Sequence, residues 1–587
     1  MRTWRLVSLL SILALVLAAC GTQGTSPTEP DEPAPTGTGA APTDGAGEPQ
    51  QGGTLVFGGS RLASSLDPVL TSDGESFRIL QQAYETLVDL APGSTNELVG
   101  ALAESWEGEP DGTEYVFHLR EGVTFHDGTP FNADAVVANF ERWQNLPEEM
   151  QGSAYYYDQV FDGFGPDNLM AGIEATDELT VTITLREANP AFLYGITLPC
   201  FGIVSPAVLE STNASDPSST LGTDIVQAGT GPFMLEDYIP DDSATLVRNE
   251  EYWDTPAYLD RVIIRPIADA QGRLDALRGG TVQGFDLVNP PDYETVESEG
   301  FTLVERQSFN TLYLGITPTA RETVAGLEGD SARSDLEEIY AGEESPLQDP
   351  LVRQAVAMAI DREALIEPFY GGRGTVAHTF IPDTSQWAED IAAGVEPVEF
   401  DAEGAAALLE EAGFGPDNPP TIHFWYPTEV TRPYMPDPRG LHEAIVQMLE
   451  NAGFAVESHS DIWDDPGYLF DAQNGYYDMH FLGWTGDWDD PGNFYGIHFG
   501  YSQGAPAAQF ACDVEGLEDA INAADAEVEP EARAAAWAEA AQIIHENVCF
   551  HTLVHGDTAL AFTAEVQGYE PNPTGSESFK SVWLSGD

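Results

Sequence analysis

An acidic and aromatic segment, GWTGDWDDPGNF, occupies residues 483–494. It places three aspartates and two tryptophans close together and contains no Lys or Arg: Asp487, Asp489, Asp490, Trp484 and Trp488. Carboxylates accept hydrogen bonds from an ammonium group, and aromatic faces attract cations. We therefore predict that this segment binds an ammonium group with an apolar body beside it.

A second segment, TEVTRPYMPDPRG at residues 428–440, supplies the opposite charge. Its two arginines, Arg432 and Arg439, stand far from any other Lys or Arg in the sequence. A guanidinium presents a planar fork of donors that matches a carboxylate. Together the two segments describe a clamp for a zwitterion, and a short peptide is the obvious one. The other interpretation is that Arg432 simply pairs with Glu429 or Asp437.

Both segments follow predicted strands. The first strand is IHFWYP (422–427), and a helix near 438–452, closed at Gly453, separates it from the strand FAVESHS (454–460). An irregular acidic piece then leads to the strand YDMHFLGW (477–484). Strands that alternate with helices imply a largely parallel sheet, in which ligands bind beyond the carboxyl ends of the strands.

Other elements are also readable. YVFHLR (115–120) and LTVTITL (179–185) alternate apolar and polar residues as half-buried strands do. Asp349 and Pro350 predict the start of one helix, and residues 401–414 predict another that ends at Gly413.

The sequence matches known catalytic motifs only poorly. His545 and Glu546 begin HENVC, but Cys549 stands where the zinc-protease pattern needs its second histidine. His551 and His555 lie in a segment that reads as a strand, which separates them too far to share one metal. We predict no enzyme, no metal and no cofactor, and a secreted metallohydrolase is the alternative from another class.

The N-terminus predicts export. Two arginines precede an apolar run at residues 6–17, which is shorter than a membrane-spanning helix and leads to the sequence LAAC. Residues 1–19 are the predicted signal peptide, and Cys20 is the predicted lipidation site. Residues 20–52 are rich in Gly, Pro and Thr, which predicts a disordered linker. We expect a lipid-anchored protein on the extracytoplasmic face of the cell membrane, on the periplasmic side or the cell surface.

The charge is extreme, with 98 Asp and Glu against 22 Lys and Arg and a net charge of −76. Such a chain excludes nucleic acid as a partner. Because the acidic residues are spread along the whole chain, we favour an acidic surface suited to high salt over attraction of cationic ligands. Of the cysteines beyond Cys20, we expect Cys512 to pair with Cys549, leaving Cys200.

The chain also resembles a known family through five blocks that occur in order. The blocks are LAESWEGEPDGTEYVFHLREGVTFHDGTPFNADAVVANF (102–140), GTGPF (229–233), RNEEYW (248–253), VRQAVAMAID (352–361) and GWTGDWDDPGNF (483–494). They are similar to extracytoplasmic solute-binding proteins of ABC importers, the peptide/nickel family (family 5). TRPY (431–434) and GWTGD (483–487) resemble the dipeptide-binding branch in particular.

The resemblance implies a peptide site. Arg432 would take the C-terminal carboxylate of the peptide, and Asp487 would take its N-terminal ammonium group. The remaining implied site residues are Pro433, Tyr434, Trp484, Thr485 and Gly486 on these two loops and Thr71, Ser72 and Asp73 on the opposite lobe. Asp73 departs from the family pattern, because it replaces a small residue.

The implied fold is α/β and two-lobed, the large class C type of periplasmic-binding-protein-like folds, with mixed sheets, flanking helices and a two-segment hinge. We expect lobe I at residues 53–310 plus 556–587 and lobe II at residues 311–555. The implied function is the capture of short peptides, dipeptides above all, for an ABC permease and its ATPase. We expect a monomer that meets the membrane only through its lipid anchor. A receptor for nickel, an oligosaccharide or longer oligopeptides on the same scaffold is the alternative.

Overall fold

The structure is a computed structural model that describes residues 48–109, 112–327, 333–463, 467–502, 505–575 and 577–586. The predicted signal peptide, the lipidation site Cys20 and nearly all of the predicted linker lie outside the described residues.

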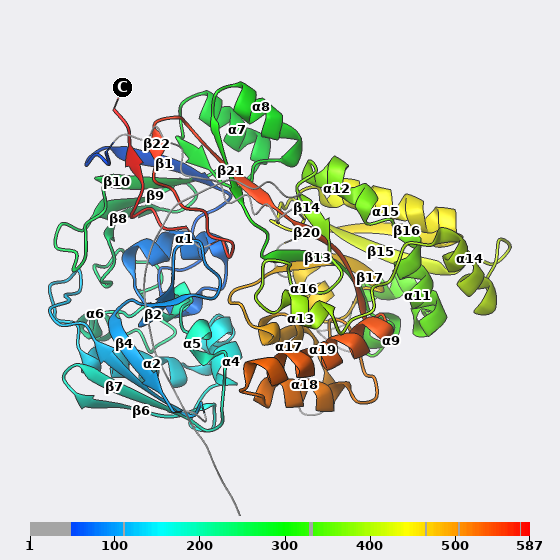
Figure 1. The fold of residues 1–587 in the computed structure, drawn as a ribbon, viewed down its shortest axis with the longest axis horizontal. Helices are drawn as coiled ribbons and strands as arrows, with labels where there is room; N and C mark the ends of the chain where they lie inside the picture. Colours follow the sequence, from blue (N-terminus) through cyan, green and yellow to red (C-terminus); the bar gives the residue numbers. More distant parts are fainter. Residues whose placement is uncertain are drawn as a thin grey trace, which may run out of the picture. The chain divides into compact units, whose positions relative to one another are not determined.

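A seven-stranded mixed sheet contains the first strand of the described chain (Figure 1). Its strands, in spatial order, are β12 (Thr302–Arg306), β21 (Thr558–Phe562), β11 (Gly284–Phe285), β1 (Thr54–Gly59), β10 (Arg261–Pro266), β9 (Ser243–Arg248) and β8 (Phe233–Ile239). Strand β1 pairs in parallel with β10 and β11, and the other pairs are antiparallel.

A four-stranded antiparallel sheet lies in the same part of the chain. Its order is β4 (Ala103–Gly108), β5 (Glu114–Leu119), β7 (Thr180–Leu185) and β6 (Met170–Asp177). Strands β5 and β7 confirm the two alternating strands predicted from the sequence. Along each strand, every second side chain is buried.

A six-stranded sheet holds both predicted binding loops. Its order is β14 (Gly374–Val376), β20 (Phe550–Gly556), β13 (Asn310–Ile316), β17 (Met479–Thr485), β15 (Thr421–Thr428) and β16 (Ala455–Ile462). The prediction of a largely parallel sheet is wrong for half of it. Strands β15, β16 and β17 are parallel, but β13, β14 and β20 come from distant parts of the chain and pair antiparallel.

Helices flank these sheets. The longer ones are α1 (Gly74–Ala83), α2 (Ala133–Gln144), α4 (Tyr155–Phe161), α7 (Ala270–Arg278), α10 (Ser334–Tyr340), α11 (Pro350–Ala359), α12 (Glu363–Tyr370), α14 (Ala402–Glu411), α15 (Pro438–Ala452), α18 (Leu517–Ala526) and α19 (Pro530–Glu546). Shorter ones include α5 (Phe192–Gly195), α6 (Pro206–Ser211), α8 (Tyr293–Ser298), α9 (Ala320–Ala325), α13 (Ala388–Ala392), α16 (Tyr468–Gln473) and α17 (Tyr495–Phe499).

The predicted helix ends are confirmed. The side chain of Asp349 accepts a hydrogen bond at the start of α11, and Pro350 is its first residue. Helix α15 ends at Gly453, which has a φ of 108° that favours glycine. Helix α16 was not predicted, because the sequence before YDMHFLGW was read as irregular.

The chain passes between the seven-stranded and six-stranded sheets twice. The first passage joins β12 to β13, and the second joins β20 to β21 through the single residue Asp557. Strands β20 and β21 are labelled in Figure 1. Next to the first passage, Arg306 shares the buried carboxylates of Asp286 and Glu577 with Arg78. These ion pairs tie the end of the chain to helix α1 and to strand β12.

Separate apolar clusters lie in the part of the chain that contains the seven-stranded and four-stranded sheets and in the part that contains the six-stranded sheet. One packs beneath the four-stranded sheet around Phe117, Phe140 and Trp143, and another packs between β15 and α15 around Phe424 and Ile445. No helix of the described residues has the length and apolar character needed to cross a membrane.

Candidate functional site

The two predicted binding loops follow neighbouring strands. Strands β15 and β17 run parallel, with Phe424 opposite Met479 and Trp425 opposite His480. The segment after Thr428 and the segment after Thr485 therefore leave the same edge of the sheet. This is the arrangement that the sequence predicts for them.

Tyr434 packs the first loop against strand β17. Its ring lies on Gly483, where a Cβ atom would stand 2.3 Å from two ring carbons. The hydroxyl of Tyr370 donates to the backbone carbonyl of Tyr434 over 2.8 Å. Tyr434 is thus buried and fixed. Arg432 and Pro433 line a small pocket together with Asp557 of the second passage and Val288, which follows strand β11.

Arg432 presents a guanidinium that lacks a carboxylate partner among the described residues. Its central carbon lies 4.3 Å from the ring centre of Trp463, and its Nε has no hydrogen-bond partner in that part of the chain. Burial lowers the pKa of Arg432, an effect that Tyr434 and, to a smaller extent, the charges of Asp73 and Glu75 partly offset. The guanidinium is therefore held in an apolar setting that favours an incoming anion.

The alternative pairing of Arg432 is wrong within the described residues, because neither Glu429 nor Asp437 forms an ion pair with it. The side chain of Asp437 caps helix α15 by accepting the N–H of Gly440. Arg439 is 76% exposed and pairs with Glu443 over 2.9 Å, so it points away from the loop core.

One carboxylate oxygen of Asp487 accepts a hydrogen bond, and the other has no partner among the described residues. Oδ1 accepts a hydrogen bond from the hydroxyl of Tyr156 over 2.8 Å, whereas Oδ2 is shielded from solvent and has no partner among the described residues. Burial raises the pKa of Asp487 to about 7, although the side chains of Tyr156 and Asn493 oppose this rise. A buried carboxylate with a free oxygen is suited to a cationic donor, because such a donor would compensate the cost of burial.

The other two aspartates are occupied. Asp489 accepts hydrogen bonds from the hydroxyl of Ser385 and from the backbone N–H of Gln386. Asp490 forms two hydrogen bonds with Arg533, of 2.7 and 3.1 Å. The acidity of this loop is therefore mostly structural, and only Asp487 remains for a ligand.

Asn493 organises the wall beside Asp487. Its Oδ1 accepts hydrogen bonds from the indole N–H of Trp484 at 3.2 Å and from the backbone N–H of Asp487 at 2.9 Å. Thr485 lies opposite Asn310 in the sheet. Gly486 donates its N–H to Phe309, whose ring would lie 2.4 Å from a Cβ atom at that position.

The side chain of Trp488 extends from the loop after β17 to the part of the chain that contains the four-stranded sheet. It is 5% exposed and belongs to the apolar cluster of the four-stranded sheet, not to that of its own sheet. With the hydrogen bond from Tyr156 to Asp487, it joins the loop after β17 to helix α4 and its surroundings.

The third predicted segment precedes helix α1. Thr71 is buried and donates its hydroxyl to the carbonyl of Pro68, and Ser72 is exposed. Asp73 caps α1 through Ser76 and pairs with Arg61 at 3.1 Å. Its departure from the family pattern therefore has a local structural role.

Three neighbours of these side chains were missed from the sequence: Tyr156, Trp463 and Asn493. Asn493 stands in the quoted motif and was available as a signal. Tyr156 and Trp463 carry no local pattern, since their positions follow only from the folded chain.

The predicted cysteine pairing is confirmed, because Cys512 and Cys549 form a disulfide. Cys549 is thereby unavailable to a metal. His551 and His555 lie on strand β20, as predicted. Among the described residues one group of imidazole and carboxylate ligands gathers, His423 with Glu457 and His459, and it lies outside the two loops.

A serine-hydrolase pattern, GYSQG at residues 500–504, does not have the context of a nucleophile elbow. Such an elbow joins a strand to a following helix. Here helix α17 precedes the pattern, and Ser502 lies on the short strand β18 (Tyr501–Ser502), which pairs with β19 (Ala505–Pro506).

Residues 97–506 match the family model of bacterial extracellular solute-binding proteins, family 5 Middle. The chain belongs to this family. Family 5 proteins are solute-binding proteins with the two-lobed α/β fold, so the chain is a binding protein and not an enzyme. The resemblance noted in the sequence is thereby confirmed.

Proteins that are similar in sequence or structure match nearly the whole chain. The dipeptide-binding protein of Escherichia coli is 28% identical over 91% of this chain and 95% of its own length. Heme-binding protein A of Haemophilus influenzae is 29% identical over 91% of this chain and 92% of its own length. The structure of the ABC transporter-associated periplasmic binding protein DppA from Helicobacter pylori, in complex with peptide STSA, matches with a TM-score of 0.73 and 25% identity, over 92% of this chain and 99% of that one.

Proposed function

We propose that this family 5 protein captures short peptides, dipeptides above all, through Arg432 and Asp487. The proposal rests on two charged side chains that lack ion-pair partners among the described residues and stand on loops that follow neighbouring strands. Arg432 lacks a carboxylate among the described residues, and Asp487 keeps one shielded oxygen free. A peptide supplies the missing anion at one end and the missing cation at the other.

The remaining residues take supporting roles in this proposal. Pro433, Tyr434, Trp484, Thr485 and Gly486 form the walls on the two loops. Thr71, Ser72 and Asp73 face the peptide backbone from the opposite lobe. The relative named for dipeptide binding and the neighbour with bound STSA favour a peptide over other solutes.

A heme ligand, suggested by the name of one relative, fits these charges less well. Heme carries carboxylates that suit Arg432 but has no ammonium group for Asp487. A metal ligand would not need the two charges together. The requirement for both Arg432 and Asp487 therefore separates a peptide from these alternatives.

Binding in this proposal is coupled to closure of two lobes, residues 53–310 with 556–587 and residues 311–555. The hinge consists of the two passages, near 309–316 and 555–558. The hydrogen bond between Tyr156 and Asp487 is a contact that the closed form gains. A ligand held by the loops of one lobe favours closure because the closed form adds contacts.

The proposed protein is tethered by lipid on Cys20 to the extracytoplasmic face of the cell membrane. It works as a monomer and delivers peptide to an ABC permease, whose partner ATPase drives uptake. No reaction takes place in this chain.

The test is calorimetry with dipeptides on an Arg432→Ala variant. Loss of one partner of a buried charge pair costs about 2–5 kcal/mol, which weakens affinity by roughly 30-fold to several thousand-fold. We expect the thermal transition to stay nearly unchanged, because Arg432 pairs with no carboxylate among the described residues.

Arg439→Ala is the matched control, since Arg439 stands in the first turn of helix α15, directly after the loop of Arg432, and is exposed. It is expected to keep the affinity of the unaltered protein. Native dipeptide affinity in Arg432→Ala would remove Arg432 from the site.

A further inference from the structure

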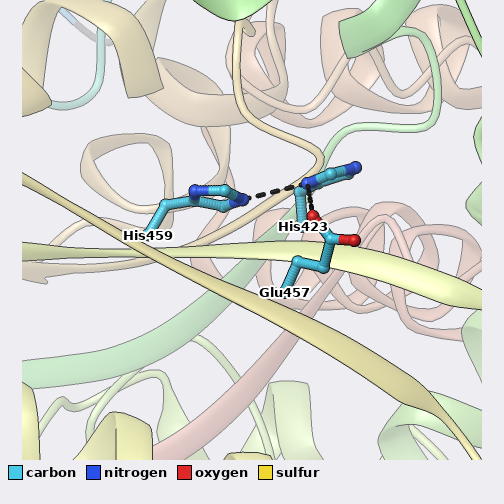
Figure 2. A group of neighbouring side chains, drawn as sticks. All are labelled: His423, Glu457 and His459. Carbon is cyan, nitrogen blue, oxygen red and sulfur yellow. Dashed lines mark hydrogen bonds and ion pairs between the residues drawn. The ribbon is translucent and has the colours of Figure 1, made fainter. Parts of the chain in front are cut away.

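Three potential metal ligands gather on strands β15 and β16. In the parallel register His423 lies opposite Glu457, and His459 follows two residues later on β16. Side chains alternate along a strand, so the three share one face of the sheet. Figure 2 shows the two imidazole rings and the carboxylate converging from these strands.

The distances suit a single ion. Nδ1 of His423 lies 2.9 Å from Nε2 of His459 and 3.6 Å from Oε2 of Glu457. A tetrahedral zinc ion with bonds of about 2.0–2.1 Å places its ligand atoms about 3.3 Å apart. Because the two ring nitrogens share one hydrogen at most, at least one of them already offers a lone pair.

The neighbours of the rings hold them in place. Tyr340 contacts His423 edge-on with ring centres 5.2 Å apart, and Trp425 stacks on His459 at 4.5 Å. Nearby Arg321 is engaged with buried Asp478, so its charge is compensated. Ligands fixed in this way lose little freedom when an ion binds.

The site is also reachable. His423 is buried, His459 is half-buried, and the side chain of Glu457 is 60% exposed on the edge strand of the sheet. An ion can therefore enter from solvent beside Glu457. The large negative charge of the chain raises the local concentration of cations.

We propose that His423, Glu457 and His459 form a transition-metal site that joins the edge strand β16 to β15. Two imidazoles and one carboxylate suit Zn²⁺, Ni²⁺ or Cu²⁺, whereas Mg²⁺ and Ca²⁺ prefer oxygen ligands alone. His423 is five residues from the end of β15, so the site stands roughly 16 Å along the strand from the peptide loops. The proposal does not rest on the nature of the solute.

The first test is titration of the purified chain with Zn²⁺ by calorimetry, in excess Mg²⁺ to occupy acidic surface groups. Co²⁺ then serves as a spectroscopic probe, because tetrahedral Co²⁺ with nitrogen ligands absorbs visible light strongly. We expect one equivalent to bind and at least a tenfold loss of affinity in both His459→Ala and Glu457→Gln. Zn²⁺ is expected to raise the melting temperature of the unaltered protein and to leave that of His459→Ala unchanged.

His118→Ala is the control, because His118 stands 3.8 Å from Glu107 on a strand and lacks a second histidine. It is expected to bind Zn²⁺ as the unaltered protein does. The proposal is overturned if the unaltered protein binds no Zn²⁺ in excess Mg²⁺. It is equally overturned if His459→Ala retains the same affinity and stoichiometry.

Discussion

Three aspartates stand within the four residues 487–490, shortly after strand β17, and their surroundings give them different chemical environments. Asp489 and Asp490 are satisfied by Ser385 and Arg533, whereas Asp487 has a free oxygen and a pKa raised by burial to about 7. The sequence alone could not rank the three, because their partners lie in distant segments.

Asp487→Asn is expected to weaken dipeptide binding and to stabilise the ligand-free protein. Burial raises the folded-state pKa above the ordinary value of 3.8, so the folded state loses stability as pH rises from about 4 to about 7. The loss is on the order of a few kcal/mol, since each pKa unit is worth about 1.4 kcal/mol. Thermal melts at about pH 5 and about pH 8 are expected to show a larger gain for the variant at the higher pH.

The same carboxyl sets the pH dependence of binding. An ammonium group binds the ionised form, so affinity is expected to be highest between about pH 7 and about pH 8 and to fall up to tenfold per unit below about pH 7. Above about pH 8 affinity is expected to fall again, because the amino group of the peptide loses its proton. The exposed Asp417→Asn variant is the control, and it should follow the unaltered protein. Equal pH dependence in Asp487→Asn would exclude Asp487 as the group that titrates.

At the scale of elements, the contact between Tyr434 and Gly483 joins the arginine loop to strand β17. Gly483→Ala would place a Cβ atom 2.3 Å from the Tyr434 ring and 2.6 Å from the carbonyl of Thr311. We expect a loss of about 1–3 kcal/mol in stability, because one of these neighbours must move. We also expect weaker dipeptide binding, since displacement of Tyr434 moves Arg432.

Gly172→Ala is the matched control on strand β6, where a Cβ atom meets nothing within 4 Å. Denaturant unfolding and calorimetry of both variants check the prediction. Unchanged stability in Gly483→Ala would show that the loop does not depend on this contact.

The helices and strands also show how much of the fold could be predicted from the sequence. Alternation and helix caps were enough to predict β15, α15 and its end at Gly453, and hence the two loops. The antiparallel neighbour of β17 could not be predicted, because that strand, β13, precedes it by more than 160 residues. Tyr156 and Trp463 were missed for the same reason, since non-local packing alone brings them to the loops.

At the scale of the whole molecule, the net charge of −76 sets a general sensitivity to salt. Self-repulsion of like charges destabilises a compact state, and salt screens it over about 10 Å at 0.1 M and about 3 Å at 1 M. We therefore expect the melting temperature to rise by several degrees between these concentrations of NaCl. A protein of near-zero net charge, melted in the same buffers, controls for general salt effects, and an unchanged or lower melting temperature would contradict the prediction.

Trp488 gives the molecule a natural reporter. Its indole is carried by the loop after β17 but lies among the apolar side chains of the four-stranded sheet. Any separation of the two parts must draw this ring from an apolar environment into water, which shifts tryptophan emission to longer wavelength. Because the chain contains 11 tryptophans, the part of the emission shift that a Trp488→Phe variant loses would report the proposed opening and closing at this contact, without an attached dye.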